Sequence, residues 1–238
     1  MDFSFLSTYG SMFVSGTINT VLISLATLLF GCLLGVFICM ARISNNKIIQ
    51  FISGAYIEFL RGTPLLVQIY IVYFSFPAFG IRFPSIGPIP SDFVAGIFAL
   101  TINSSAYISE ILRSGIQAVD KGQMEASRSL GLNYVQSMKL VVIPQALKNV
   151  LPALANEFIT LIKESSIISV IGIRDLMYTA DIVRGNTYKP LEPLLVAAFI
   201  YFVLTFALSR ALAYIEKNMQ NSDKKKVHTL VRTSESEE

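Results

Sequence analysis

Five stretches of the chain are apolar over nearly their whole length and are separated by more polar segments. Each approaches the length of about 20 residues that a helix needs to cross the hydrocarbon core of a membrane. None shows the sustained alternation of apolar and polar residues that is typical of membrane-spanning strands. The pattern therefore predicts an all-α membrane protein with about five transmembrane helices. Their expected ranges are 17–41, 64–81, 93–111, 149–171 and 194–213.

Composition agrees with this pattern and excludes several kinds of site. Hydrophobic residues make up 53% of the chain and charged residues 15%, whereas a soluble domain has about 25% charged residues. The first basic residue is Arg42, so the basic start of a cleaved signal peptide is missing and the first span is expected to be permanent. The sole histidine, His228, shares no metal-binding spacing with Cys32 or Cys39. We expect no catalytic residues, no metal site and no nucleic-acid binding.

The distribution of Lys and Arg predicts the orientation of the spans. If the N-terminus is outside, most of the 19 basic residues fall in inner loops or in the C-terminal segment. The outer loops then hold only Arg82, Arg174, Arg184 and Lys189. Because cytoplasmic loops carry an excess of basic residues, the N-terminus is expected outside and the C-terminus inside.

The chain divides into one long apolar region and a short polar end. Residues 1–216 are expected to form the transmembrane domain. Residues 217–238 contain a basic block followed by an acidic end, a composition typical of a disordered tail. Its lysines either contact anionic lipid headgroups or stay solvated.

The inner connection at about 113–148 is much longer than a usual connector of 2–6 residues. Two short helical patterns flank Gly131, where a turn with positive φ would favour glycine. Pro144 and Pro152 restrict how the following helix can begin. We expect a structured cytoplasmic platform.

The same connection contains Glu125-Ala126-Ser127, then Gly131, then Val141-x-Ile143-Pro144. This pattern resembles the cytoplasmic loop motif of ABC importer permeases. The family pattern is Glu-Ala-Ala, three residues, Gly, nine residues and Ile-x-Leu-Pro, and every spacing is met here. Ser127, Val141 and Ile143 depart from the pattern but are similar in size to the family residues. The residues that carry the motif are Glu125, Ala126, Ser127, Gly131, Val141, Ile143 and Pro144.

Three further stretches are similar to signatures of the polar amino acid uptake group of type I importers. They read "RGTPLLVQ" at 61–68, "SAYISEILRSGIQAV" at 105–119 and "LIKESSIISVIG" at 161–172. The resemblance extends over about residues 56–172. It implies a permease subunit in the bacterial cell membrane that moves an amino acid by alternating access.

The resemblance also implies a set of partners. A second permease chain, identical or related, would complete the path. Two cytoplasmic ATPase subunits would bind the connection at about 113–148, which in this family acts as the coupling loop. An extracytoplasmic binding protein would deliver the amino acid. No Walker A motif occurs in the sequence. We therefore expect no cofactor in this chain, and ATP and Mg²⁺ on the partner ATPase.

The fourth span carries polar residues on one side only. With 100° per residue, five polar side chains fall within a sector of about 120°. Charged residues at mid-bilayer cost about 2.5–3.5 kcal/mol each on insertion scales, so this face should meet protein or water rather than lipid. The five residues are Asn156, Glu157, Thr160, Lys163 and Glu164.

Two interpretations of this polar face stay open. Lys163 either pairs with Glu157, Glu164 or Glu110 to hold helices together, or the face lines the transport path. In the second case Lys163 and a glutamate supply the two charges that an amino acid needs. Within the family, Lys163 and Glu164 resemble general gating or helix-pairing groups. Glu157 is then the better candidate for specificity, favouring a basic substrate.

The third span has a weaker polar stripe at Asn103, Tyr107 and Glu110. It either completes the cavity, with Glu110 facing Lys163 or Arg113, or only bonds helices to one another. Near the second span, Glu58 and Arg61 are three residues apart and are expected to pair. Thr63 and Gln68 either line the path or bond between helices.

Other function classes fit less well. A serine–histidine protease is excluded because His228 lies near the C-terminus, and the Asp residues fall in loops or at span ends rather than inside spans. The remaining alternative is an ion-coupled secondary carrier or channel for small polar solutes. Five spans without an inverted repeat argue against it, and dependence of uptake on ATP would discriminate the two.

Overall fold

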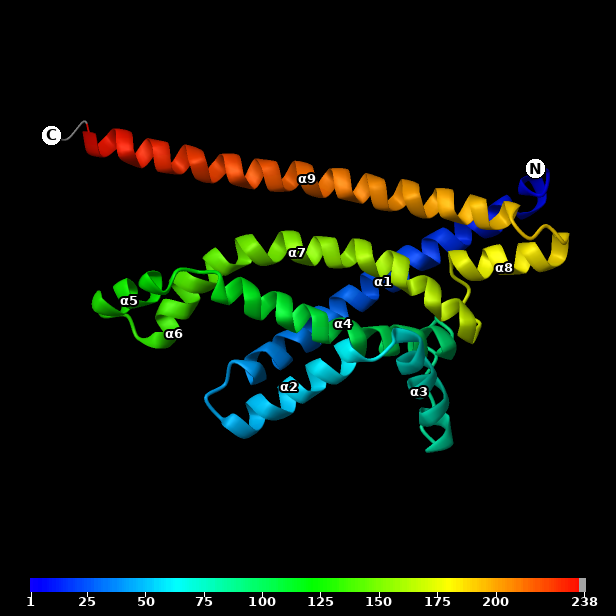
Figure 1. The fold of residues 1–238 in the computed structure, drawn as a ribbon, viewed down its shortest axis with the longest axis horizontal. Coiled ribbons are helices and arrows are strands. Elements are labelled where there is room, and N and C mark those ends of the chain that lie inside the picture. Colours follow the sequence, from blue (N-terminus) through cyan, green and yellow to red (C-terminus); the bar gives the residue numbers. More distant parts are fainter. Residues whose placement is uncertain (236–238) are drawn as a thin grey trace.

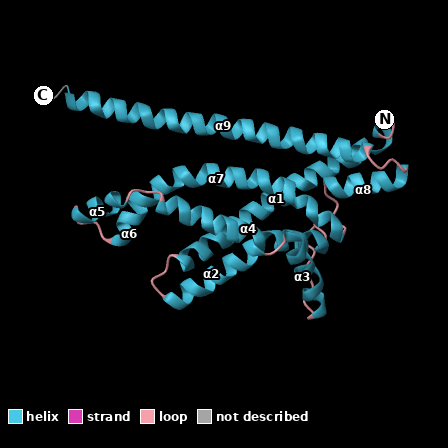
Figure 2. Cartoon of the chain, in the orientation of Figure 1, coloured by secondary structure: helices cyan, strands magenta, loops and turns pink. Residues whose placement is uncertain are grey.

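The computed structural model describes residues 1–235, with side chains up to Lys217. Apart from an isolated bridge between Ile86 and Ile89, the described residues form helices and their connections (Figures 1 and 2). The helices are α1 Leu6–Arg42, α2 Lys47–Gly62, α3 Leu65–Ala78, α4 Ser91–Gln117, α5 Lys121–Ser129, α6 Tyr134–Ser137, a π-helical segment Met138–Val142, α7 Ile143–Glu164, a 3₁₀ segment Ser165–Ile171, α8 Leu176–Thr187 and α9 Glu192–Glu235.

Four helical segments are long and apolar enough to cross a membrane, and a bent pair gives a fifth candidate. The four are Leu6–Arg42, Ser91–Gln117, Tyr134–Ile171 and Glu192–Lys217. The all-α fold and the number of spans predicted from the sequence are thus confirmed. The fourth span is longer than expected because it begins in the cytoplasmic loop and continues through α7 without a break.

The second span differs from the prediction of one helix over 64–81. It is broken into α2 and α3, and the chain bends by 109° between the two helices. Pro64 has no N–H to continue the helix and keeps Thr63 in an extended conformation, with φ −117° and ψ 148°. The apolar window detected in the sequence was therefore only the second half of a bent element.

Buried amides satisfy the backbone groups that this break releases. The Nε2 atom of Gln68 donates to the carbonyl oxygen of Leu60 at 2.8 Å and to that of Thr63 at 3.1 Å. The Nδ2 atom of Asn103 on α4 donates to Oε1 of Gln68 at 2.9 Å. In a membrane interior such groups would otherwise lose their partners at a cost of several kcal/mol. Of the two roles left open for Gln68, the hydrogen bond between helices is therefore observed.

Helix α4 lies at the centre and packs against α1, α2, α3 and α7. Its approach to α1 is close because two glycines of α1 face Ile108 of α4. A Cβ atom would lie 3.0 Å from Ile108 at Gly31 and 2.8 Å at Gly35. Figure 1 shows that the ribbons of α1 and α4 cross. The small residues permit the close packing that is common between membrane helices.

The outer end is held together by a buried carboxylate at the start of α8. Asp175 is fully buried and accepts the backbone N–H of Tyr178 at 2.7 Å and the hydroxyl of Tyr201 on α9 at 3.4 Å. Next to it, the N–H of Leu176 donates to the Thr20 hydroxyl of α1 at 3.1 Å. These contacts join α1, α8 and α9 at the end opposite the α5–α6 loop (Figure 1).

Helix α9 continues to Glu235, whereas the sequence predicted a disordered tail from residue 217. Lys, Glu, Gln and Met are good helix formers, so the polar composition that indicated disorder is also compatible with a helix. Residues 236–238 lie outside the described part of the chain. The division of the chain at residue 216 stays a prediction.

Candidate functional site

A cleft of about 560 Å³ lies between α4 and α7. It is located toward the end of the molecule that carries the α5–α6 loop. Tyr107 and Glu110 of α4, Glu157 of α7 and Arg61 of α2 line it, together with small and apolar residues. The structure thus brings together three residues predicted for the substrate path and adds an arginine.

Glu157 projects from α7 toward α4. Its side chain is partly buried, and its Oε1 atom lies 3.5 Å from the hydroxyl of Ser104, at the limit of a hydrogen bond. This is a weak partner for a carboxylate, which usually takes shorter, charge-assisted bonds. Glu157 therefore keeps capacity to bind a group that enters the cleft.

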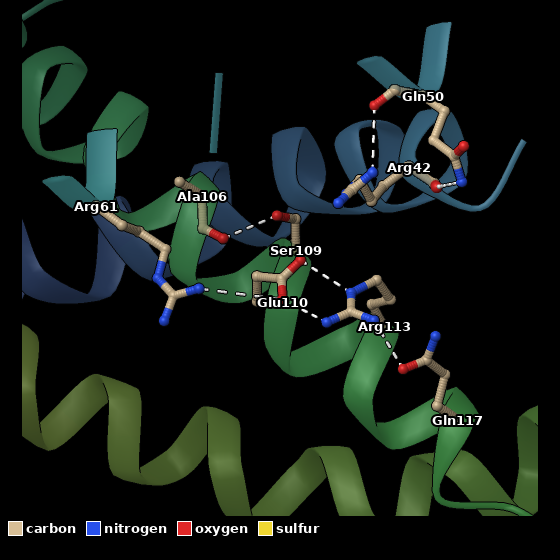
Figure 3. Close-up of polar contacts among 8 residues, drawn as sticks. All are labelled: Arg42, Gln50, Arg61, Ala106, Ser109, Glu110, Arg113 and Gln117. Carbon is tan, nitrogen blue, oxygen red and sulfur yellow. Dashed lines mark hydrogen bonds and ion pairs between the residues drawn. The ribbon is translucent and has the colours of Figure 1, made fainter. Parts of the chain in front are cut away.

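Glu110 has a strong partner on its own helix (Figure 3). Arg113 donates to its two oxygens from Nε at 2.9 Å and from Nη2 at 2.7 Å. The alternative in which Glu110 faces Arg113 is confirmed, and its pairing with Lys163 is not found. Arg113 also donates to Oε1 of Gln117 at 2.7 Å, which holds its guanidinium along α4.

Arg61 points toward α4, and the predicted pair with Glu58 is wrong. Figure 3 shows the Arg61 guanidinium directed at Glu110, and the Nη1 to Oε2 distance is 4.0 Å. Its Cζ atom lies over the Tyr107 ring, 5.5 Å from the centroid. Glu58 is exposed and makes no ion pair with a described residue. Spacing alone suggested a pair, but the charged neighbour of Arg61 is Glu110 on α4.

The rest of the polar face of α7 lies outside this cleft. Asn156 and Lys163 are exposed, and Thr160 and Glu164 are partly buried. The Thr160 hydroxyl donates to the backbone carbonyl of Asn156 at 3.2 Å. Lys163 forms no ion pair within 4.0 Å in the described part of the chain. The predicted pairing of Lys163 with a glutamate is therefore not found within one chain.

Asn103 does not reach the cleft. Its side chain is almost fully buried and donates to Gln68 at the bend between α2 and α3. The interpretation of the α4 stripe as a bond between helices thus holds for Asn103, whereas Tyr107 and Glu110 line the cleft. Sequence reasoning missed Arg61 as a cleft residue. The available signal was a basic residue directly before the helix-breaking sequence Gly62-Thr63-Pro64.

The cytoplasmic loop forms a compact unit of short helices. Gly131 has φ +90°, a conformation that side chains rarely tolerate, so the turn predicted there is confirmed. After this turn Asn133 and Gln136 form a capping box at the start of α6. The Gln145 side chain of α7 donates to Oε1 of Gln123 on α5 at 3.2 Å, and Val119, Val142 and Ala146 form a small core beneath. The loop is therefore stiffly joined to α4 and α7.

The motif residues occupy different parts of this unit. Ser127 is buried and donates to the Met124 carbonyl at 2.9 Å. Glu125, Ala126, Ile143 and Pro144 are exposed, and Val141 is partly buried. Beyond them, the tip presents Leu130, Tyr134 and Val135, with Leu130 85% exposed and Val135 70% exposed. An apolar tip on a rigid loop is typical of a contact surface for another protein.

No cluster of three His, Cys, Asp or Glu residues that could hold a metal ion occurs among the described residues. The charged groups of the cleft are suited to binding a zwitterion.

Comparisons with known proteins agree with these features. Residues 27–221 match the family described as "Binding-protein-dependent transport system inner membrane component". The chain is 41% identical to the "Probable glutamine ABC transporter permease protein GlnM" of Bacillus subtilis (strain 168), over 93% of this chain and all of that protein. It is 39% identical to the "Arginine transport system permease protein ArtQ" of the same organism, over 94% of this chain and 99% of that protein.

Solved structures give the same result. A chain in the "Crystal structure of an amino acid ABC transporter with histidines" is 46% identical, with a TM-score of 0.85 over 92% of this chain and 99% of that one. A chain of the MetNI methionine ABC transporter has a TM-score of 0.73 at 20% identity and the same coverage, which shows a shared fold. The chain therefore belongs to the family of binding-protein-dependent transport system inner membrane components, which confirms the ABC permease identified from its cytoplasmic loop.

Proposed function

We propose that this chain is the membrane-spanning subunit of an ATP-driven amino acid importer that favours substrates with a cationic side chain. The observation that carries the proposal is the cleft between α4 and α7, in which Glu157 has no strong partner. The names of the relatives, which include a glutamine and an arginine permease, support an amino acid as substrate. An acidic group in the path favours the arginine-like class.

A second permease chain completes the path. Lys163 and Asn156 are exposed along α7, although a charge that faces lipid at mid-bilayer costs about 2.5–3.5 kcal/mol. A partner chain or a water-filled path that covers this face removes the cost. Asn156, Thr160, Lys163 and Glu164 then line the boundary between two chains, where alternating access opens and closes the route.

The energy comes from a separate ATPase subunit that binds the cytoplasmic tip. Leu130, Tyr134 and Val135 enter a groove of that subunit, and Gly131 and the capping box fix their position. ATP and Mg²⁺ are held by the ATPase, so this chain needs no cofactor of its own. Two ATPases serve two permease chains in a bacterial inner membrane, and an extracytoplasmic binding protein delivers the amino acid.

Uptake into proteoliposomes tests this function. The permease is reconstituted with its co-purifying ATPase and binding protein, and ATP-dependent uptake of labelled L-arginine is measured against a panel of unlabelled amino acids. We expect arginine, lysine and histidine to compete better than glutamine. Glu157→Gln should reduce this preference roughly tenfold or more, since a charge-assisted bond contributes about 1.5–3 kcal/mol.

Glu192→Gln, which removes a carboxylate in the first turn of α9, serves as the matched control and should keep the preference. Unchanged selectivity in Glu157→Gln would contradict the role of Glu157. Uptake that requires an ion gradient and proceeds without ATP would instead identify a secondary carrier.

A further inference from the structure

The charges that line the cleft are not balanced in pairs. Glu110 is bound by Arg113 through two short hydrogen bonds, so its charge is already compensated. Arg61 is left with a 4.0 Å contact to Oε2 of the same carboxylate and with the Tyr107 ring. It forms no hydrogen bond with a described residue, although a guanidinium has five N–H donors.

The position of the Arg61 guanidinium is nevertheless defined. Its Cζ atom lies 5.5 Å from the centroid of the Tyr107 ring, within the range of a cation–π contact, and its side chain lines the cleft and is 47% exposed. A cation in this location faces water or a ligand, because exposure to lipid would be costly. Arg61 also directly precedes the bend between α2 and α3, where the Gln68 bonds fix the backbone.

Among the described residues that line the cleft, Arg61 is the only Lys or Arg. The cavity of about 560 Å³ lies within the range of roughly 300–1,000 Å³ that small-molecule sites occupy. An α-amino acid carries a carboxylate, which a guanidinium binds with two parallel hydrogen bonds. Glu157 supplies the opposite charge within the same cleft.

We infer that Arg61 binds the α-carboxylate of the transported amino acid in the cleft between α4 and α7, with Glu157 receiving the cationic end. Arg61 thus takes the role that one of the two interpretations of the α7 polar face gave to Lys163. The inference rests on the proposed function and names the binding group within it. Arg113 keeps Glu110 from competing with the substrate for Arg61.

A comparison of two ligands tests the inference directly. The complex of permease and ATPase is placed in nanodiscs without the binding protein, and equilibrium binding of labelled L-arginine and labelled agmatine, which is arginine without its carboxylate, is measured. We expect Arg61→Gln to weaken L-arginine binding by roughly 10- to 100-fold and to leave agmatine binding unchanged. Arg61→Lys should give an intermediate loss, because an ammonium ion keeps the charge without the bidentate geometry.

Arg184→Gln, which removes an exposed arginine of α8, is the matched control and should bind both ligands as the unmodified chain does. Equal L-arginine affinity in Arg61→Gln would overturn the inference. Equal losses for L-arginine and agmatine would also overturn it, since they would indicate a structural role for Arg61.

Labelled L-glutamine is measured in parallel, with 4-aminobutyramide as its counterpart without a carboxylate. If glutamine binds in place of arginine, the substrate class assigned to Glu157 fails while the same comparison still tests Arg61. If the complex of the unmodified chain retains neither amino acid, the proposed function fails and the Arg61 inference with it.

Discussion

The carboxylates of this protein have very different surroundings, and these surroundings determine which partners each carboxylate binds and at which pH it titrates. Glu110 lies beside an arginine, Glu157 faces a cleft, and Asp175 is enclosed at the outer end. Burial raises the pKa of the Asp175 carboxyl to about 7, although the Tyr178 N–H and the Tyr201 hydroxyl partly oppose this shift. Between about pH 4 and pH 7 the folded chain therefore binds more protons than the unfolded chain.

The raised pKa of Asp175 predicts that stability falls as pH increases across this window. The free energy of unfolding should decrease by about 1.4 kcal/mol per pH unit from this group and level off above pH 7. Asp175→Asn keeps an acceptor for the Tyr178 N–H and removes the titration. In detergent, its melting temperature should vary less than that of the unmodified chain between pH 5 and pH 7.

Asp181→Asn on the same helix provides the comparison for this measurement. Asp181 is 38% exposed and paired with Arg184, so its removal should leave the pH slope in place. Equal slopes in Asp175→Asn and in the unmodified chain would contradict the assignment.

The neighbours of individual charged side chains could not be predicted from the sequence. Helical periodicity placed Glu157 and Lys163 on one face of α7, but periodicity does not say which neighbour each side chain meets. Lys163 is exposed and makes no ion pair among the described residues, whereas Arg61 lines the cleft. The only sign in the sequence of the bend that follows Arg61 was the helix-breaking stretch Gly62-Thr63-Pro64.

At the scale of helices, close crossings depend on small residues. Gly16 of α1 lies against the start of α8, where a Cβ atom would be 2.6 Å from the Thr179 hydroxyl and 2.9 Å from the Asp175 carbonyl oxygen. Gly10, on the same helix, has no atom within 4 Å of such a position. The two glycines therefore differ in what a methyl group would encounter.

Gly16→Ala is expected to destabilise the protein by about 1–3 kcal/mol, because the backbone at Asp175 cannot move away easily. Gly10→Ala should be neutral or slightly stabilising, since alanine is the better helix former. Melting temperatures of the two variants in detergent test this contrast. Equal melting temperatures would show that α1 and α8 do not pack as described.

The prediction of helices from apolar windows succeeded for four spans and was incomplete for the second. Windows measure how apolar a stretch is, and α2 escaped detection because it is amphipathic, with Lys47, Glu58 and Arg61 among its apolar residues. Its direction relative to α3 depends on the buried Gln68 and Asn103 amides. Such tertiary bonds are not visible in a local pattern.

On the scale of the whole molecule, the cleft and the cytoplasmic tip are connected through α4 and α7. Both helices line the cleft, and both are joined to the loop by the Val119, Val142 and Ala146 core. A displacement of the tip would therefore move the walls of the cleft without an additional linker. The loop motif was recognisable from the sequence because its spacing is local. The exposure of Val135, in contrast, is known only from the three-dimensional structure.

We propose that the apolar tip of Leu130, Tyr134 and Val135 receives motion from a separate ATPase. The most direct measurement is the amount of ATPase that co-purifies with tagged permease carrying Val135→Asp, together with ATP-driven arginine uptake. Ile86→Asp, an equivalent change at an exposed residue of the 79–90 connection, is the control. We expect Val135→Asp to lose both the ATPase and uptake, and Ile86→Asp to keep both. Full ATPase binding and full uptake in Val135→Asp would contradict it.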